Sequence, residues 1–354
     1  MGTWDVGPFD SDAAADFCGD LDEAPEAARP GLVRDALVRV LDAADPLDQG
    51  LAVPAVAAAA LVAAQCPGGR PVTSAYGPDL PVPELPADLR DIAVRALHRV
   101  RAEPSELRAL WADTDRYPHW LRSLDLLLRV LTFPAPQPVA RSWARIGGWM
   151  RRHAPVSYAL LAAPAEPAEV ESAQQEMGVR FPADLLASLA CHDGITEWAN
   201  LLPGPPPLSV GGMLAHWRMC VEIAGDDPDL TEPHGDGEDD EPWWHPQWIP
   251  WAESDGDSQV IDLREGPGRG RLGSAAHDDT GRFDDGWPSL AVYLTAVADA
   301  LDQGGEADGM TPYLTPEGEL WWAFPGETEL NGDPLTPARP LPGRSTVPRA
   351  ACSS

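Results

Sequence analysis

Two short clusters of side chains in this chain could do chemistry. Cys191, His192 and Asp193 are consecutive and combine a thiol, an imidazole and a carboxylate. A catalytic triad needs its members to converge in space, and consecutive residues point in different directions, so this cluster alone does not predict catalysis. The segment 277–279, His-Asp-Asp, could join His192 in a metal site. A hydrolase that uses His192, Asp193 and His277 is therefore one hypothesis for the structure to decide.

The remaining spacing of potential metal ligands argues against a specific metal site. The cysteines contain no CxxC pair, so neither a zinc ribbon nor a disulfide framework is indicated. The acidic segment 226–241 could attract calcium, but it lacks the ordered spacing of an EF-hand. P-loop, GxGxxG, HExxH and GxSxG motifs are also missing from the sequence. We therefore predict no metal and no cofactor.

The acidic segment 226–241 and the two tryptophans after it suggest a different activity, the binding of a protein. The segment holds nine carboxylates and no Arg in a chain of net charge −31. Such charge repels nucleic acid and anionic lipid and attracts a basic protein, while tryptophan supplies contact energy. The alternatives are that the charge serves solubility and that the tryptophans fill a core. The predicted partner-binding residues are Asp236, Glu238, Asp239, Asp240, Glu241, Trp243 and Trp244.

Residues 1–132 read as a small all-α bundle, because apolar residues recur at helical spacing and no strand pattern appears. Pro54 is expected in the first turn of its helix, and Ser105 is expected to cap a short one. The expected longer helices cover 31–44, 54–66, 87–102 and 120–131.

The start of this region has two interpretations. Asp10, Asp12 and Asp16 form a cation or partner site, or they cap a helix and lie in solvent. The pieces MGTW, GPFDSDAAADF and SELRALW resemble an uncharacterised bacterial domain family that has a Met-Gly-Thr-Trp start and is known as a domain of unknown function. The resemblance covers most of 1–132 and implies nothing about chemistry.

Residues 133–140 are Pro-rich and uncharged, as in a linker between domains. In residues 141–306 we expect a helix that ends at Gly178, a second helix that starts at Pro182, and a turn at Asp193-Gly194. Strand candidates and a closing helix follow, which indicates an α+β domain with a mainly antiparallel sheet. The strand candidates cover 243–254, 259–266 and, more weakly, 268–279, and the closing helix covers 287–304. Residues 307–334 read as a hairpin extension and 335–354 as a disordered tail.

The order of pieces from SWARIGGWMRRHAP through GVRFPADL and HDG to WWHPQWIPWAESDGDSQVIDL and WPSLAVYL resembles the SUKH superfamily, which includes the yeast Smi/Knr cell-wall synthesis regulator. The resemblance implies a protein-binding α+β domain without enzymatic activity. Many bacterial members are immunity proteins that neutralise toxins. We therefore expect a bacterial immunity protein for a basic toxin, and the alternative is a regulatory scaffold without a toxin.

The chain has no signal peptide and no apolar run long enough to span a bilayer, so a cytoplasmic location without membrane or nucleic-acid partners is expected.

Overall fold

The computed structural model describes residues 5–232 and 241–340. The chain forms two compact units, Met1–Phe133 and Pro134–Ser354. Part of the tail predicted to be disordered, 341–354, lies outside the described residues. Within the described ranges, every helix is too short or too polar to cross a bilayer.

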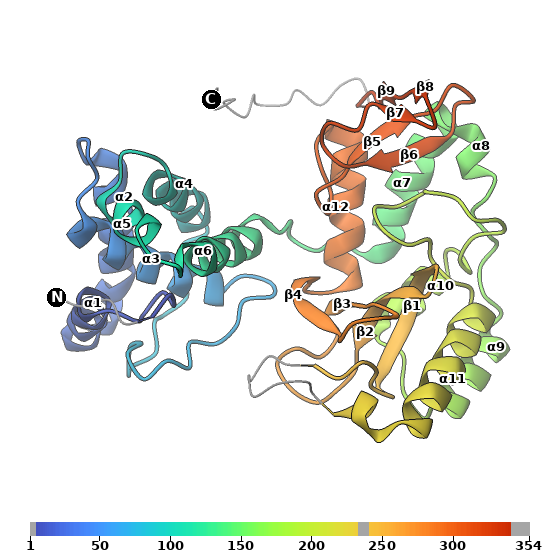
Figure 1. The fold of residues 1–354 in the computed structure, drawn as a ribbon, viewed down its shortest axis with the longest axis horizontal. Coiled ribbons are helices and arrows are strands. Elements are labelled where there is room, and N and C mark those ends of the chain that lie inside the picture. The colour runs from blue at the N-terminus through green and yellow to red at the C-terminus, as the bar shows by residue number, and fades with distance from the viewer. Residues whose placement is uncertain (1–4, 233–240, 341–354) are drawn as a thin grey trace. The chain divides into compact units, whose positions relative to one another are not determined.

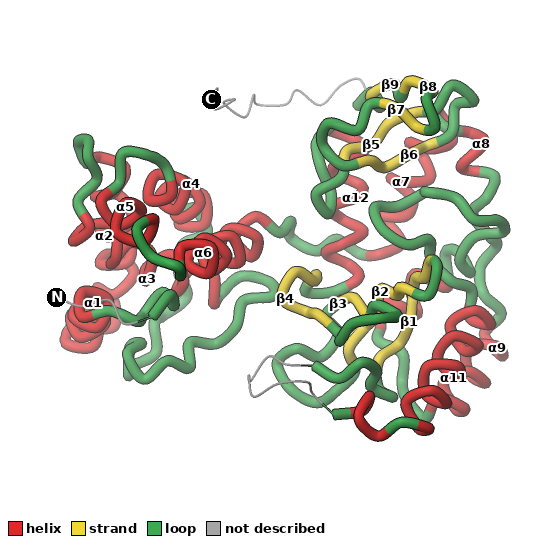
Figure 2. The backbone as a smooth tube through the Cα atoms, viewed as in Figure 1, coloured by secondary structure: helices red, strands yellow, loops and turns green. Residues whose placement is uncertain are grey.

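The described part of the first unit is built from helices around α3 (Figures 1 and 2). This Ala-rich helix packs against α1, α2, α4 and α6, and its small side chains let the neighbouring helices approach closely. The predicted all-α fold is confirmed. The helices are α1 (Asp12–Glu23), η1 (Glu26–Ala28), α2 (Arg29–Asp42), α3 (Gln49–Ala64), α4 (Leu89–Arg101), α5 (Glu106–Ala112) and α6 (Tyr117–Thr132).

Capping side chains set where these helices begin. Ser105 accepts a hydrogen bond from the Arg108 N–H, which confirms the predicted cap of α5. The prediction that α3 starts near Pro54 is wrong, because the helix begins at Gln49 and Pro54 lies inside it. The Asp48 carboxylate accepts from the Gly50 N–H at 2.7 Å, so it caps the helix well before the proline.

The acidic start of α1 shows the same use of side chains. Ser11 caps the helix by accepting from the Ala14 N–H at 3.2 Å, and Asp10 accepts from the Gly7 N–H at 3.1 Å. Asp10 therefore holds the turn that precedes α1, and the cap of the helix is Ser11. Among the residues that the structure describes, no group of three or more metal-ligating side chains comes together.

The second unit is organised around an antiparallel sheet with the strand order β1-β2-β3-β4 (Figure 1). One face carries Trp248, Val260 and Phe283 and is covered by α11. On α12, the Tyr293 ring lies 5.7 Å from the ring of Trp251, a residue of β1. The predicted α+β class is therefore confirmed. The strands are β1 (Trp248–Ser254), β2 (Asp257–Asp262), β3 (Leu272–Ala275) and β4 (Arg282–Trp287).

Helices enclose this sheet. α12 packs along α7, and α9 packs along α11 (Figure 1). As predicted, α9 ends at Gly178, whose φ of 67° suits glycine, and α10 starts directly after Pro182. The helices are α7 (Val139–His153), α8 (Pro155–Tyr158), α9 (Pro167–Met177), α10 (Ala183–Leu189), α11 (Val210–Asp226), η2 (Pro228–Thr231) and α12 (Leu290–Gln303).

Helix α11 and strand β4 are the longest elements of this unit that were not predicted from the sequence. Helix α11 starts with a Gly-Gly pair at 211–212, which weakens its helical signal, yet Ser209 and Asp193 both cap it. Strand β4 contains two aspartates and a glycine, residues that are depleted in strands. Its pairing with β3, rather than its own propensity, makes it a strand.

The C-terminal part of the second unit adds a small sheet with the strand order β6-β5-β9 (Figure 1). Strands β5 and β6 form an antiparallel hairpin around the turn at 316–318, and β9 returns beside β5. The strands are β5 (Thr311–Leu314), β6 (Leu320–Ala323), β7 (Glu329–Leu330), β8 (Asp333–Pro334) and β9 (Thr336–Pro337).

The core under α11 leaves no space at Gly281. A Cβ atom built there lies 2.3 Å from Cη2 of Trp248. We expect Gly281→Ala to lower the free energy of unfolding by about 2 kcal/mol through overpacking, measured by urea denaturation with tryptophan fluorescence. As the control, Gly148→Ala within α7 meets no atom within 4 Å and should be neutral or stabilising. Equal stability of the two variants would contradict this account of the core.

Candidate protein-binding surface

The segment 241–247 crosses from the acidic loop to β1 and is fixed at several points. Trp244 is buried, and its ring lies 6.0 Å from the ring of Trp248 in an edge-to-face arrangement. Trp243 is half-buried, and its indole N–H donates to the His277 carbonyl at 3.0 Å. Trp217 on α11 donates to the Pro246 carbonyl at 2.9 Å. Trp243 is therefore the tryptophan of this pair that a partner can contact.

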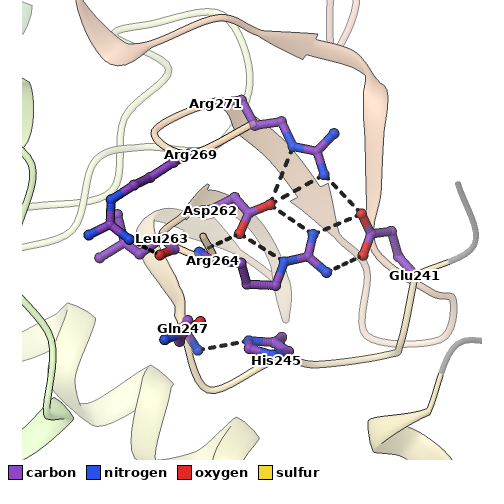
Figure 3. Close-up of polar contacts among 8 residues, drawn as sticks. All are labelled: Glu241, His245, Gln247, Asp262, Leu263, Arg264, Arg269 and Arg271. Atoms are coloured by element: carbon purple, nitrogen blue, oxygen red, sulfur yellow. Dashed lines mark hydrogen bonds and ion pairs between the residues drawn. The ribbon is translucent and has the colours of Figure 1, made fainter. Parts of the chain in front are cut away.

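A cluster of two carboxylates and two guanidinium groups holds the start of this segment (Figure 3). Arg264 donates to both oxygens of Glu241, at 2.6 and 2.8 Å, and to both oxygens of Asp262, at 2.9 and 2.8 Å. Arg271 donates to Glu241 at 3.0 Å and to Asp262 at 3.3 Å. We call these four residues the Arg264 cluster. It ties the end of the acidic loop to the ends of β2 and β3.

Burial strengthens the electrostatic attraction between the charged groups of this cluster, because little water screens it. The side chains of Asp262 and Glu241 are 3% and 11% exposed. Burial alone raises the pKa of Asp262, but hydrogen bonds from Arg264 outweigh it and lower the pKa overall. Burial opposes the charge of Arg264 as well, and its hydrogen bonds to Glu241 and Asp262 raise its pKa despite this. Pairing therefore stabilises the charged forms of both Asp262 and Arg264.

The same guanidinium groups lie over aromatic rings. Arg264 is 5.3 Å from the ring centre of Trp248, and Arg271 is 4.2 Å from that of Phe283. At these distances a cation is attracted to the ring face. The Arg264 cluster thus connects the charged surface to the core under α11.

The structure describes three of the predicted partner-binding residues, Glu241, Trp243 and Trp244, and each lies in a different environment. Asp236, Glu238, Asp239 and Asp240 lie outside the described residues. Glu241 is paired within the Arg264 cluster, and Trp244 supports the surface from inside the core. Trp243 is half-buried, so part of its ring is accessible. Exposed carboxylates at the base of the loop are Glu222, Asp226 and Glu232.

Sequence reasoning missed the arginines of the cluster. The sequence placed Arg264 and Arg271 only within the strand candidates 259–266 and 268–279, with no role assigned to either. A usable signal was the alternation of charge in DLREGPGRGR, residues 262–271, where a tight loop brings Asp262 close to both arginines. Their common partner Glu241 is distant in sequence, so no local pattern could have identified it.

The residues of the hydrolase hypothesis take part in separate local contacts. His192 Nδ1 lies 2.8 Å from the Ala162 carbonyl, and the Asp193 carboxylate caps α11 through the Val210 N–H. His277 pairs with Asp257 at 2.9 Å, which raises the pKa of the imidazole. No hydrogen bond joins the three within the described chain. The cavity that His192 lines holds about 10 Å³, which leaves no space for a substrate.

A serine–histidine contact that sequence reasoning missed lies beneath Trp244. Ser258 Oγ is 2.8 Å from Nε2 of His216, and Cys220 Sγ is 3.4 Å from the same nitrogen. Ser258 is 3% exposed, and burial lowers the pKa of His216 and raises that of the Cys220 thiol to about 12. This cluster is a polar part of the core, because a substrate cannot reach the hydroxyl.

The fold and the surface together define a two-unit protein in which a helical bundle precedes an α+β domain. Residues 164–296 match the SMI1 / KNR4 family (SUKH-1). Residues 2–123 match a domain of unknown function (DUF4259). These findings confirm both resemblances. No curated protein matches the chain.

The Arg264 cluster generates a pH-dependent prediction. Replacing Asp262 with Asn leaves the partly buried Arg264 guanidinium with one carboxylate partner instead of two, so we expect Asp262→Asn to cost about 3 kcal/mol at pH 7. The folded-state pKa of Asp262 is lowered, so its contribution is present above the unfolded value of about 4 and is lost as pH falls through the folded value. The difference from wild type should therefore shrink below about pH 4. Urea denaturation at a series of pH values measures it.

The matched control is Asp279→Asn. This residue forms an exposed ion pair with Arg282, so its loss should cost under about 1 kcal/mol. If the two variants are equally stable at pH 7, the cluster does not stabilise the fold as described.

Proposed function

We propose that the second unit is a protein-binding module that binds a basic protein with the surface formed by the acidic loop 226–241 and Trp243. The observation that carries the proposal is the position of Trp243. Its indole is held by the His277 carbonyl at the end of the acidic loop, and part of the ring is accessible. A rigid, half-exposed tryptophan beside clustered carboxylates suits an interface, since little conformational entropy is lost when a partner covers it.

The charge distribution supports a basic partner. Glu222, Asp226 and Glu232 are exposed at the base of the loop, and the whole chain carries a net charge of −31. Clustered charge of one sign raises the rate at which an oppositely charged protein arrives in the correct orientation. The Arg264 cluster neutralises Glu241, so we assign the attraction to the carboxylates that precede it in the loop.

We further propose that the basic partner is a toxin and that the protein acts as its immunity protein. The match of residues 164–296 to the SMI1 / KNR4 family (SUKH-1) supports this assignment. A non-enzymatic inhibitor of this kind would cover the basic surface by which a toxin contacts its own substrate. A regulatory scaffold is the alternative, and it differs by binding several partners weakly instead of one tightly.

The electrostatic part is tested by neutralising the eight carboxylates of residues 226–240 with Asn and Gln, leaving Glu241 in place. We expect the full-length variant to lose its partner in a pull-down from native lysate, because the steering charge is gone. Equal recovery by the variant and the wild type would contradict the proposal. A control variant removes eight exposed carboxylates of the first unit and should retain the partner. These are Asp16, Asp20, Glu23, Glu26, Asp35, Asp42, Glu84 and Asp91.

The aromatic part is tested by comparing the two adjacent tryptophans. Trp243→Ala should weaken binding of the recovered partner about tenfold while the fold is retained, because its ring lies at the surface. Trp244→Ala should instead lower the thermal midpoint, since this ring fills the core. Calorimetric titration and thermal unfolding of both variants measure these effects. Unchanged affinity in a folded Trp243→Ala protein would remove Trp243 from the interface.

A further inference from the structure

The small C-terminal sheet presents a row of aromatic side chains. In the register of β5 and β6, Tyr313 lies opposite Trp321, and in that of β5 and β9 it lies opposite Pro337 (strands in Figure 1). Residues directly opposite each other in an antiparallel sheet project from the same face. The Trp198 ring, from the loop before α11, lies 6.2 Å from the Trp321 ring. We call Trp198, Trp321, Tyr313 and Pro337 the aromatic row.

The other face of this sheet packs into the unit. Trp322 and Pro312 are opposite each other in the register, and both are buried. The Trp322 indole donates to the Leu201 carbonyl at 3.1 Å. The sheet therefore has an inner face and an outer face, and the aromatic row belongs to the outer one.

The aromatic row is accessible and fixed in place. Trp198 is 62% exposed, Pro337 is exposed, and Trp321 and Tyr313 are half-buried. The Trp198 indole donates to the Ser254 hydroxyl at 3.3 Å, which ties the ring to the end of β1. Contiguous exposed aromatic surface on a folded domain indicates an interaction site.

The free edge of β6 is closed to strand addition. The Asn200 side chain accepts from the Trp322 N–H at 3.0 Å and donates to the Trp322 carbonyl at 3.2 Å. The Leu320 N–H donates to the Ser157 hydroxyl at 2.8 Å. With these backbone groups already paired, an added peptide strand has few partners at this edge. A ligand must therefore use the side chains of the outer face.

The charge around the aromatic row selects a cationic ligand. The described residues 309–340 contain five carboxylates and one arginine, Arg339, so this segment carries a net negative charge. Glu197 precedes Trp198 in the sequence, and Asp255 accepts a hydrogen bond from the same Ser254 hydroxyl that holds Trp198. An arginine or lysine of a ligand would meet both carboxylates and the faces of tryptophan rings.

We propose that the aromatic row binds a proline-rich, arginine- or lysine-containing segment of a partner protein in the polyproline II conformation. Such a segment is extended before binding, so it loses little entropy, and its proline rings pack between aromatic side chains. Cationic residues among the prolines complement the carboxylates. Tyr313, Trp321 and Pro337 lie outside residues 164–296, and the row shares no residue with the acidic loop 226–241. Failure of one proposal therefore leaves the other untouched.

The test is calorimetric titration of the full-length protein with a nonapeptide of three Pro-Pro-Arg repeats. We expect saturable binding. The matched peptide of Ala-Ala-Arg repeats should bind about tenfold more weakly, because it lacks the preformed conformation and the proline rings. A peptide of Pro-Pro-Glu repeats should also bind at least about tenfold more weakly. Equal binding of the Pro-Pro-Arg and Ala-Ala-Arg peptides would overturn the proposal, since charge alone would explain it.

Variants locate the peptide on the protein. Trp198→Ala and Trp321→Ala should each weaken binding of the Pro-Pro-Arg peptide about tenfold or more. Phe324→Ala removes another exposed aromatic ring, 53% exposed and outside the row, and should leave binding unchanged. Trp198 is mostly exposed, so Trp198→Ala remains decisive if Trp321→Ala fails to fold. Unchanged binding in Trp198→Ala, or an equal loss in Phe324→Ala, would overturn the proposal.

Discussion

The guanidinium group of Arg264 is the point on which the surface of the second unit depends. It is bound by two carboxylates that come from distant parts of the chain, Glu241 and Asp262, and it lies over the ring of Trp248. Partly buried charges of one sign are unfavourable without partners, so none of these groups is stable in its position alone. Their mutual pairing fixes where the acidic loop ends and where the segment with Trp243 begins.

This arrangement divides neighbouring residues of similar chemistry between two roles. Trp244 and Trp248 pack edge to face under α11, while Trp243 lies partly in solvent and is held through its indole N–H. Among the acidic residues, Glu241 forms ion pairs within the Arg264 cluster, whereas Asp226 and Glu232 are exposed. The residues that lie inside, Trp244 and Glu241, therefore fix the shape of the surface around Trp243.

The second unit presents two surfaces that suit different ligands. The surface proposed around the acidic loop and Trp243 suits a folded basic protein, because residues 226–241 hold nine carboxylates and no Arg. The aromatic row offers neighbouring, tilted rings of Trp198 and Trp321 with a closed strand edge beside them, which favours an extended segment. Both surfaces rest on tryptophans held by hydrogen bonds, to the His277 carbonyl in the first and to the Ser254 hydroxyl in the second.

The sequence by itself determined the elements whose signals are local. The end of α9 at Gly178, the start of α10 after Pro182 and the cap of α5 at Ser105 depend on backbone conformation and short-range hydrogen bonds, so they could be predicted. Its ordered motifs were also enough to identify the two families that the comparisons confirmed. The helical start of the chain and the antiparallel class of the second unit followed from periodicity.

Only the tertiary structure decided which residues of the candidate surface are accessible. Trp243 and Trp244 are adjacent and chemically identical, and their exposure differs because α11 and the sheet enclose one ring and not the other. Glu241 looked like one more loop carboxylate until Arg264 and Arg271, more than twenty residues away in sequence, were placed beside it. Strand β4 and the face of the aromatic row likewise depend on pairing between strands. Burial and long-range pairing are properties of the folded chain, so no local pattern records them.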